Sequence, residues 1–291
     1  MIVITGASGK LGSLVVDRLL ERVPADQVGV SVRDPERADG LAARGVRVRR
    51  GDFAEPSSLA AAFEGATQVL LVSVNAIGPE KVAQHIGAVD AAYAAGAKRV
   101  LYTSHQGAGA ASLFSPMVDH AATEEYLSAL GTPFTSLRNG YYADTIPALF
   151  GQAIETGELV APADGPVSWT AHADLAEAAA RTLVDGLFDG PTPPLTAPDV
   201  YDLEQVAALL SELSGRPVRR VVVDDEEWRA GMVARGVPED RATLLLGTFL
   251  ASRRGEFAAT DPALEELLGR PATALREFLG HRLAGGLGGR G

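Results

Sequence analysis

The residues best suited to chemistry form a glycine-rich segment directly after the first apolar run of the chain. Thr5–Gly12 reads Thr-Gly-Ala-Ser-Gly-Lys-Leu-Gly, a G-x-x-G-x-x-G spacing between a predicted strand and a predicted helix. Gly6 permits a tight turn, Gly9 lets the backbone approach a pyrophosphate, and Gly12 lets the helix lie close to the sheet. The helix N-terminus then offers unpaired N–H groups and a positive dipole end to phosphates. The segment predicts dinucleotide binding.

The end of the second predicted strand bears on which dinucleotide is bound. Arg33 stands where an NAD-specific site would place an acid for the ribose 2′-hydroxyl, and a guanidinium suits a 2′-phosphate better. Ser8 and Lys10 of the glycine segment can add contacts. Asp34 keeps NAD(H) open as the alternative, although its place before Pro35 is explained by helix capping. We therefore expect NADP(H).

Three further predicted strands end in residues that face the same crevice. Asp52 could meet the adenine amino group while Phe53 packs beside the ring. The ends of the next two strands supply Ser73–Asn75, then Thr103 and Ser104. Serine and asparagine are also common turn formers, so the position of these residues supports a cofactor contact more than their type does.

The elements that must position these residues alternate between strands and helices. Strands are predicted at 2–5, 28–32, 46–48, 69–74, 99–103 and 134–137, with helices at 11–22, after Asp34-Pro35, and at 57–63, 80–95 and 118–130. This alternation implies a parallel sheet with right-handed crossovers. We predict an α/β fold, a Rossmann-type doubly wound parallel sheet.

The alternation weakens after about residue 140. Helices are predicted at 144–155, 171–187, 225–235 and 239–252, a strand at 218–223, a Pro-rich loop at 190–194, and two short helices after Thr260 and Pro271. Asp202 and Gln205 form a capping box for one more helix. We expect an NAD(P)-binding domain at 1–140, to which a later helix or strand can return. A smaller mixed, mostly helical C-terminal substrate lobe is expected at 141–283, and a flexible tail at 284–291.

The composition excludes several classes of function. The chain of 291 residues has a formal net charge of −11 and three unclustered lysines, which argues against nucleic acid as a partner. It contains no cysteine, and its five histidines show no ligand spacing, so no metal site is expected. No apolar run is long enough to span a membrane, and no basic region precedes the first apolar run. We expect a cytoplasmic monomer or homodimer without a membrane partner.

The acid of the usual short-chain dehydrogenases is missing. That group pairs a tyrosine with a lysine four residues later, which lowers the tyrosine pKa. The residues four positions before Lys10, Lys81 and Lys98 are Gly6, Ile77 and Ala94. No Tyr-x-x-x-Lys pair therefore exists in the chain, and the usual alcohol dehydrogenase mechanism does not apply.

Five motifs in order give the chain a family resemblance. They are Thr5–Gly12, Val32–Pro35, Tyr102–Ser104, His120 with Thr123 and Glu124, and Leu137–Tyr142. Together they resemble the NmrA-like atypical short-chain dehydrogenases, and within them the type-2 NAD(P)H:quinone oxidoreductases. The resemblance spans almost the whole chain. It implies a Rossmann domain, a small substrate lobe, and hydride delivery from NADPH to a quinone or similar electrophile, and it accounts for the missing Tyr-x-x-x-Lys pair.

Carried over by position, the resemblance places Gly6–Leu11, Arg33, Ser73–Asn75 and Arg138–Tyr142 along the cofactor. Tyr141 stands where that group has tryptophan, and the Gly-, Ala- and Ser-rich segment 105–117 also differs from the group. With the strand-end residues, the predicted cofactor-binding set is Gly6, Ala7, Ser8, Gly9, Lys10, Leu11, Gly12, Arg33, Asp52, Phe53, Ser73, Val74, Asn75, Thr103, Ser104, Arg138, Asn139, Gly140, Tyr141 and Tyr142.

A quinone needs little acid catalysis, because its carbonyl already accepts hydride and the reduced oxyanion is stabilised by aromaticity. Water or a neutral donor can supply the proton while the site fixes the hydride path. The candidate donors are Tyr142, Asn139 and His120, although His120 could be a structural histidine and Tyr142 a packing aromatic. The candidate substrate contacts are His105, Phe150 and Trp169; the latter two could equally belong to a core.

The leading hypothesis is an NADPH-dependent reductase of a quinone, enone or related carbonyl compound. The alternative from another class is a non-catalytic NAD(P) sensor that regulates a partner protein, as the NmrA name implies for some relatives. A sensor would have a cofactor site with no room beside the nicotinamide. An epimerase or dehydratase is a third hypothesis, and the missing Tyr-x-x-x-Lys pair counts against it.

Overall fold

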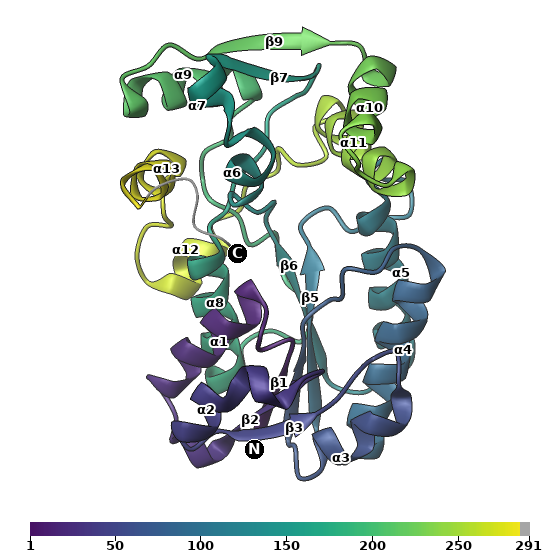
Figure 1. The fold of residues 1–291 in the computed structure, drawn as a ribbon. Helices are drawn as coiled ribbons and strands as arrows, with labels where there is room; N and C mark the ends of the chain where they lie inside the picture. The colour runs from purple at the N-terminus through teal and green to yellow at the C-terminus, as the bar shows by residue number, and fades with distance from the viewer. Residues whose placement is uncertain (286–291) are drawn as a thin grey trace.

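The computed structural model of the chain describes residues 1–285. Within this range a seven-stranded parallel sheet runs in the order β3-β2-β1-β4-β5-β6-β8 (Figure 1). Its strands are β1 (Ile2–Thr5), β2 (Val28–Val32), β3 (Arg47–Arg50), β4 (Gln68–Leu71), β5 (Arg99–His105), β6 (Phe134–Asn139) and β8 (Gly190–Pro191). The strand order reverses between β1 and β4, which is where doubly wound sheets bind ligands at their carboxyl ends. The predicted Rossmann-type fold class is confirmed.

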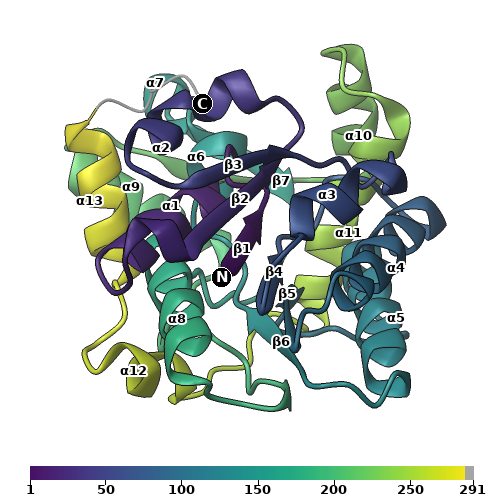
Figure 2. The ribbon, with the colours of Figure 1, turned by 90° about the horizontal axis from the view of Figure 1, so that it is seen from below.

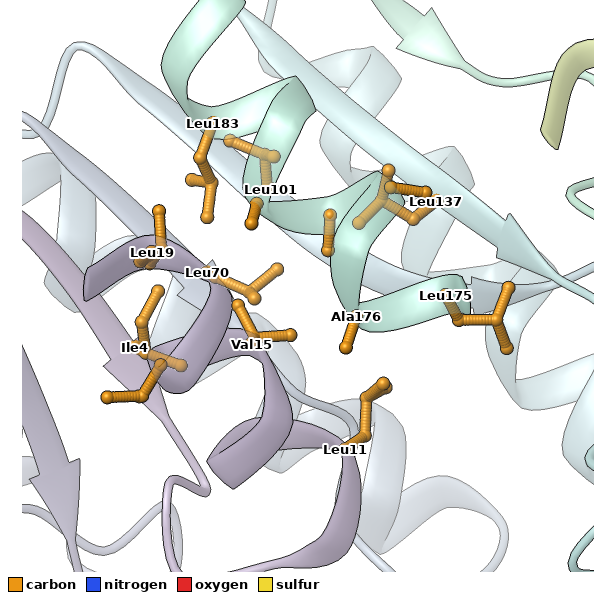
Figure 3. Packing of buried hydrophobic residues seen from close by; sticks show 14 of the residues in the cluster. Ile4, Leu11, Val15, Leu19, Leu70, Leu101, Leu137, Leu175, Ala176 and Leu183 are labelled. Atoms are coloured by element: carbon orange, nitrogen blue, oxygen red, sulfur yellow. The ribbon is translucent and has the colours of Figure 1, made fainter. Parts of the chain in front are cut away.

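Helices cover both faces of the sheet (Figure 2). One face carries α1 (Lys10–Leu20) and α8 (His172–Asp185), with α12 (Ala263–Leu268) beside α8; α2 (Asp39–Ala43) lies near the sheet edge. The other face carries α3 (Leu59–Phe63), α4 (Pro79–Ala94) and α5 (Ser115–Ala129). Figure 3 shows the core under the first face, where α1 and α8 pack together over the strands through Ile4, Leu11, Val15, Leu19, Leu70, Leu101, Leu137, Leu175, Ala176 and Leu183.

A second group of elements lies beyond the carboxyl ends of the strands, at the top of Figure 1. It contains α6 (Thr145–Phe150), α7 (Ala153–Thr156), α9 (Leu203–Ser214), α10 (Asp225–Ala234), α11 (Glu239–Arg253) and α13 (Leu275–Ala284), with β7 (Glu158–Pro162) paired in parallel to β9 (Arg219–Val223). We call this group the lobe. It has its own apolar core, which includes Phe150, Trp169, Val206, Phe249 and Phe257.

Several elements differ from the sequence predictions for local physical reasons. β4 ends at Leu71 because the N–H groups of Val72 and Ser73 donate to side-chain hydroxyls instead of a strand. The helix predicted at 144–155 is two helices, which Gly151 and Gln152 separate. The segment after Asp34 begins as a 3-10 helix, which Asp34 caps. β7 and the two-residue β8 were not predicted; β8 lies in the Pro-rich loop.

The path of the chain bears on its division into domains. α8, β8 and α12 all follow residue 141, yet α8 packs on α1, β8 pairs with β6, and α12 packs on α8. We therefore propose that the substrate lobe is discontinuous in sequence, with these three elements belonging to the dinucleotide-binding part. Of the predicted tail 284–291, Ala284 is the last residue of α13, and residues 286–291 lie outside the described part of the chain.

Close contact between α1 and the glycine segment brings the helix N-terminus to the crevice. A Cβ atom on Gly12 would lie 2.3 Å from the Gly6 carbonyl oxygen and 3.1 Å from the Ala7 Cα. Both are backbone atoms and cannot rotate away, so only glycine allows this approach. Gly6 itself has a φ of +61°, the left-handed region that glycine adopts at little cost.

Gly12→Ala should destabilise the protein by about 1–3 kcal/mol, because the added methyl forces α1 away from the Gly6 turn. The same displacement should weaken NADPH binding. The matched control is Gly87→Ala in the middle of α4, where a Cβ would meet nothing within 4 Å. That change should stabilise the protein by about 0.5–1 kcal/mol, since alanine favours a helix. Urea denaturation and calorimetry measure both effects; equal stability of the two variants would contradict the contact.

Candidate active site

The N-terminus of α1 is ready to receive an anion. Gly9 is the N-cap residue, and no side chain in the described part of the chain caps the helix. The first turn contains no acidic residue, and Gly6, Ser8 and Gly9 are exposed. The turn is closed by a 2.9 Å hydrogen bond from the Gly9 N–H to the Gly6 carbonyl. Free N–H groups at the positive end of a helix dipole fit a pyrophosphate.

The end of β2 separates the roles of Arg33 and Asp34. The Asp34 Oδ1 atom accepts a 3.2 Å hydrogen bond from the Glu36 N–H and caps the 3-10 helix Pro35–Ala38. Arg33 is exposed and forms no ion pair with any residue between 1 and 285. The carboxylate is therefore engaged locally, while the guanidinium at the strand end is open to a ligand.

The segment after β4 is held by side chains from three elements. The Val72 N–H donates to Thr5 Oγ1 (2.9 Å), the Ser73 N–H to Thr103 Oγ1 (2.8 Å), and the Val74 N–H to the ring of His85 on α4 (3.2 Å). Thr103 is thereby committed to the framework. Asn75 is exposed, and Ser73 and Val74 are half-buried at the crevice.

Three enclosed polar atoms without partners gather where β5 and β6 end. They are Asn139 Oδ1, Gln106 Nε2 and His105 Nδ1. His105 and Asn139 are partners in the strand register, and the Gln106 N–H donates to the Asn139 carbonyl at 2.8 Å. Buried polar atoms are rarely left unpaired in folded proteins.

A hydrogen-bonded chain of side chains leads away from this point into the space between β5, α4 and α5. His85 Nε2 accepts from the Val74 N–H, so neutral His85 carries its proton on Nδ1, which lies 3.1 Å from Tyr102 Oη and 3.3 Å from Thr123 Oγ1. The Tyr102 hydroxyl lies 2.6 Å from His120 Nδ1. If Tyr102 accepts from His85 and donates to His120, then His120 carries its proton on Nε2.

Burial keeps these groups uncharged. Burial, with a smaller contribution from the nearby Lys81 ammonium, lowers the pKa of His85 and of His105 to about 3. The same causes hold the pKa of His120 well below its usual value. Burial also raises the pKa of Tyr102 far above its usual value. At neutral pH the site thus presents neutral imidazoles that donate hydrogen bonds without carrying a charge.

Aromatic rings form the lobe side of the site. Tyr141 lies 4.7 Å from Phe257, 5.5 Å from Trp169 and 5.7 Å from His105, measured between ring centroids. Its hydroxyl bonds to Thr248 of α11 at 3.1 Å, and burial raises its pKa to about 12. Phe150 and Trp169 line a small cavity within the lobe core. His105 thus meets an apolar wall that can receive a flat aromatic molecule.

Some predicted cofactor residues make contacts within the protein. Arg138 forms a double hydrogen bond with Glu124 (2.6 and 3.1 Å), and Ser104 donates to the same carboxylate at 2.6 Å. Phe53 is buried in the core under α3, and Asp52 Oδ1 accepts from the Ala54 N–H. Their assignment to the cofactor stays a prediction. The geometry brings Gly6–Gly12, Ser73–Asn75, Asn139 and Tyr142 to the crevice.

Tyr142 lies next to a cluster of charged and polar side chains around Asp144, which we call the Asp144 hub. Its ring stacks on His172 with 4.1 Å between centroids. His172 Nδ1 lies 2.5 Å from Asp144 Oδ2, while Asp144 Oδ1 accepts from Lys10 (2.5 Å) and Arg282 (2.6 Å). One carboxylate thus joins the glycine segment, α8 and α13. Burial raises the pKa of Asp144, but the hydrogen bonds from His172 and Lys10 outweigh it and hold the pKa well below the usual range.

Sequence reasoning missed residues whose role depends on tertiary contacts. The Gln106 Oε1 atom accepts hydrogen bonds from the Tyr141 N–H (3.1 Å) and the Ser168 hydroxyl (3.0 Å). Its place just after a predicted strand end was the available signal. His85 and Tyr102 lie inside a predicted helix and strand, where nothing local separates them from core residues.

Comparison with known proteins gives the chain its family. The profile of the NAD(P)H-binding family matches residues 6–185. Quinone oxidoreductase 2 of Escherichia coli is 34% identical over 282 residues, which covers 97% of this chain and 98% of the relative. The chain belongs to the NAD(P)H-binding, NmrA-like family. In residues 1–285 no helix is long and apolar enough to cross a membrane.

Solved structures agree over the full length. The Escherichia coli NADPH-dependent quinone oxidoreductase complexed with NADPH superposes with a TM-score of 0.92 at 33% identity, covering 97% of this chain and 100% of that one. The Citrobacter sp. triphenylmethane reductase complexed with NADP(H) gives 0.90 at 35% identity, covering 97% and 99%. Both are proteins that this chain resembles in sequence and in fold.

Asp144→Asn should lower the free energy of unfolding by about 1–3 kcal/mol at neutral pH, since three basic groups lose their shared partner and two of them are half-exposed. Because the folded-state pKa of Asp144 is depressed, its contribution is present above the unfolded pKa of about 4 and is lost as the pH falls further. The difference in free energy of unfolding between wild type and variant should therefore become smaller in strong acid.

Asp199→Asn is the control for Asp144→Asn, because Asp199 is exposed and has no partner in the described range. Denaturant titrations of the three proteins at several pH values measure this difference. A difference for Asp144→Asn that stays constant down to strong acid would contradict the Asp144 hub.

Proposed function

We propose that this member of the NAD(P)H-binding family is an NADPH-dependent reductase that transfers hydride to a quinone or a related electrophilic carbonyl compound. The observation that carries the proposal is the neutral donor chain His85–Tyr102–His120, which ends beside His105 at the carboxyl ends of the strands. The site thus has a cofactor side, at the α1 N-terminus, and an acceptor side with its own hydrogen-bond donor. The names of the relatives, a quinone oxidoreductase and a triphenylmethane reductase, support the same class of reaction.

On the cofactor side, we propose that the free N–H groups of Lys10 and Leu11 bind the pyrophosphate and that Arg33 binds the 2′-phosphate. The nicotinamide end would lie at the carboxyl ends of β5 and β6, beside Asn139 and Tyr142. Tyr142 would close this end, held in place by its stacking on His172. Bound NADPH supplies the hydride.

On the acceptor side, we propose that His120 is the hydrogen-bond donor to the acceptor oxygen. With Tyr102 donating to its Nδ1 atom, His120 would carry its proton on Nε2 and would be oriented before the acceptor binds. A neutral imidazole is a weak acid, which suits a quinone because the reduced oxyanion is stabilised by aromaticity. Water can then complete the protonation. The partly exposed ring of His105 would contact the flat acceptor, with the buried rings of Tyr141 and Phe257 packed behind it.

The sensor alternative has less support. A sensor needs the cofactor side alone, yet this chain also fixes the tautomers of buried histidines through contacts from three elements. Orienting such donors has no evident use without an acceptor. The relatives reported above are also named for oxidoreductase activity.

The first experiment is NADPH oxidation, followed by loss of the reduced nicotinamide absorbance. The acceptor panel contains benzoquinones, naphthoquinones, enones and aldehydes, with NADH in parallel and binding of both cofactors checked by calorimetry. Turnover should be fastest with quinones, because they need the least acid catalysis. Tight NADPH binding without turnover on any acceptor would favour the sensor instead.

Arg33→Ala should weaken NADPH binding by about 10- to 100-fold, since it removes a charged hydrogen bond to the 2′-phosphate, and should leave NADH binding nearly unchanged. Calorimetry with each cofactor measures the difference. Arg216→Ala is the matched control, because Arg216 is exposed and lies in the turn after α9 of the lobe, not at the end of a strand of the main sheet. Equal losses for NADPH and NADH would overturn the assignment of Arg33.

A further inference from the structure

Lys81 is the one lysine buried within the fold. It lies in the first turn of α4, directly after the segment that leaves β4 at the crevice. Only 4% of its surface is exposed, whereas Lys10 and Lys98 are exposed. A buried lysine is uncommon because removing an ammonium from water is costly unless a partner compensates it.

That compensation is incomplete within residues 1–285. Lys81 forms no hydrogen bond and no ion pair there. Asp119 on α5 is the nearby carboxylate, but its Oδ2 atom is engaged by the Gly78 N–H at 3.0 Å and lies beyond ion-pair distance. Lys81 Nζ is also not among the fully enclosed atoms without partners, in contrast to His105 Nδ1. The ammonium therefore retains a small accessible surface.

The groups around Lys81 are those of the acceptor side. Its charge acts on His85, His105 and His120, and it lowers the pKa of each beyond the lowering that burial causes. Burial also lowers the pKa of Lys81 itself, while Asp119 opposes this and favours the charged form. These imidazoles come from α4, β5 and α5. Apart from Asp119, whose Oδ2 atom accepts from the Gly78 N–H, Lys81 is the charged group among neutral imidazoles.

We propose that Lys81 contacts the acceptor oxygen and stabilises the negative charge that hydride transfer places on it. The inference rests on the proposed reductase function and names the acceptor class more closely: neutral compounds that become oxyanions, such as quinones and enones. The acceptor gains a hydride and becomes an oxyanion, NADPH is oxidised to NADP⁺, and a proton from water completes the product. An ammonium at the oxygen acts where charge develops, which is where electrostatic catalysis is largest.

This role also explains why an unpaired lysine persists in the core. Methionine has a similar length and no charge, so Lys81→Met should leave the thermal midpoint unchanged or raise it. If Lys81 instead stabilised the fold, Lys81→Met would lower the thermal midpoint. The test set is Lys81→Met, the conservative Lys81→Arg, and Lys98→Met as the matched exposed control.

The first readout does not depend on turnover. 4-Nitrophenol resembles the reduced product, ionises near neutral pH, and absorbs differently as its phenolate. Bound to the enzyme with NADP⁺, its phenolate form should bind about 10-fold more weakly to Lys81→Met than to wild type, while the neutral form binds equally. Lys81→Arg and Lys98→Met should behave like wild type. Equal phenolate affinity in wild type and Lys81→Met would overturn the proposal.

The second readout is the reaction itself. Lys81→Met should lower kcat/KM for a benzoquinone by about 10- to 100-fold, below the usual range for loss of an oxyanion donor because quinones are already electrophilic. Its Kd for NADPH should not change. Unchanged kcat/KM would overturn the role of Lys81 while the reductase stands. Phenolate binding that depends on Lys81, with no turnover on any acceptor in wild type, would support the oxyanion site and overturn the reductase function.

Discussion

The segment that leaves β4 determines both sides of the site. Its three successive N–H groups are satisfied by Thr5, Thr103 and His85 rather than by a neighbouring strand. The strand must therefore end at Leu71, and the chain leaves the sheet beside β1, where the strand order reverses. The contact with His85 also fixes the proton of that ring on Nδ1, which in turn orients Tyr102 and His120. A single backbone conformation thus links the opening for a dinucleotide to the alignment of the donor chain.

The sequence predicts features that depend on neighbours along the chain. The glycine spacing, the capping box of Asp202 with Gln205, and the cap at Asp34 all have the predicted form, because each involves residues a few positions apart. β7 and β8 escape prediction because β8 pairs through only two residues and β7 is stabilised by β9, some sixty positions away. The roles of Gln106 and Lys81 escape prediction for the same reason. The residue type does not reveal whether a buried polar group has a partner, because that depends on how the elements pack.

The charges of the chain are distributed in two different ways. The Asp144 hub gathers Lys10, His172 and Arg282 on one carboxylate, at the junction of the glycine segment with α8 and α13. The α1 N-terminus next to it carries no acid, despite a net charge of −11 for the whole chain. Excess negative charge therefore lies elsewhere, and an anionic cofactor meets local partners that favour it even though the protein as a whole repels it.

The acceptor side follows the opposite rule, because it is kept nearly free of charge. Burial makes the imidazoles of His85, His105 and His120 neutral, and aromatic rings cover the lobe side. In such a medium a single charge acts over a longer distance and more strongly than it would in water. Of the two buried carboxylates on α5, Glu124 is bound by Arg138 and Ser104, and Asp119 accepts from the Gly78 N–H. Lys81 is left as the cation whose field the acceptor would experience, so one unpaired ammonium can replace a Tyr-x-x-x-Lys pair when the acceptor needs its oxyanion stabilised more than it needs an acid.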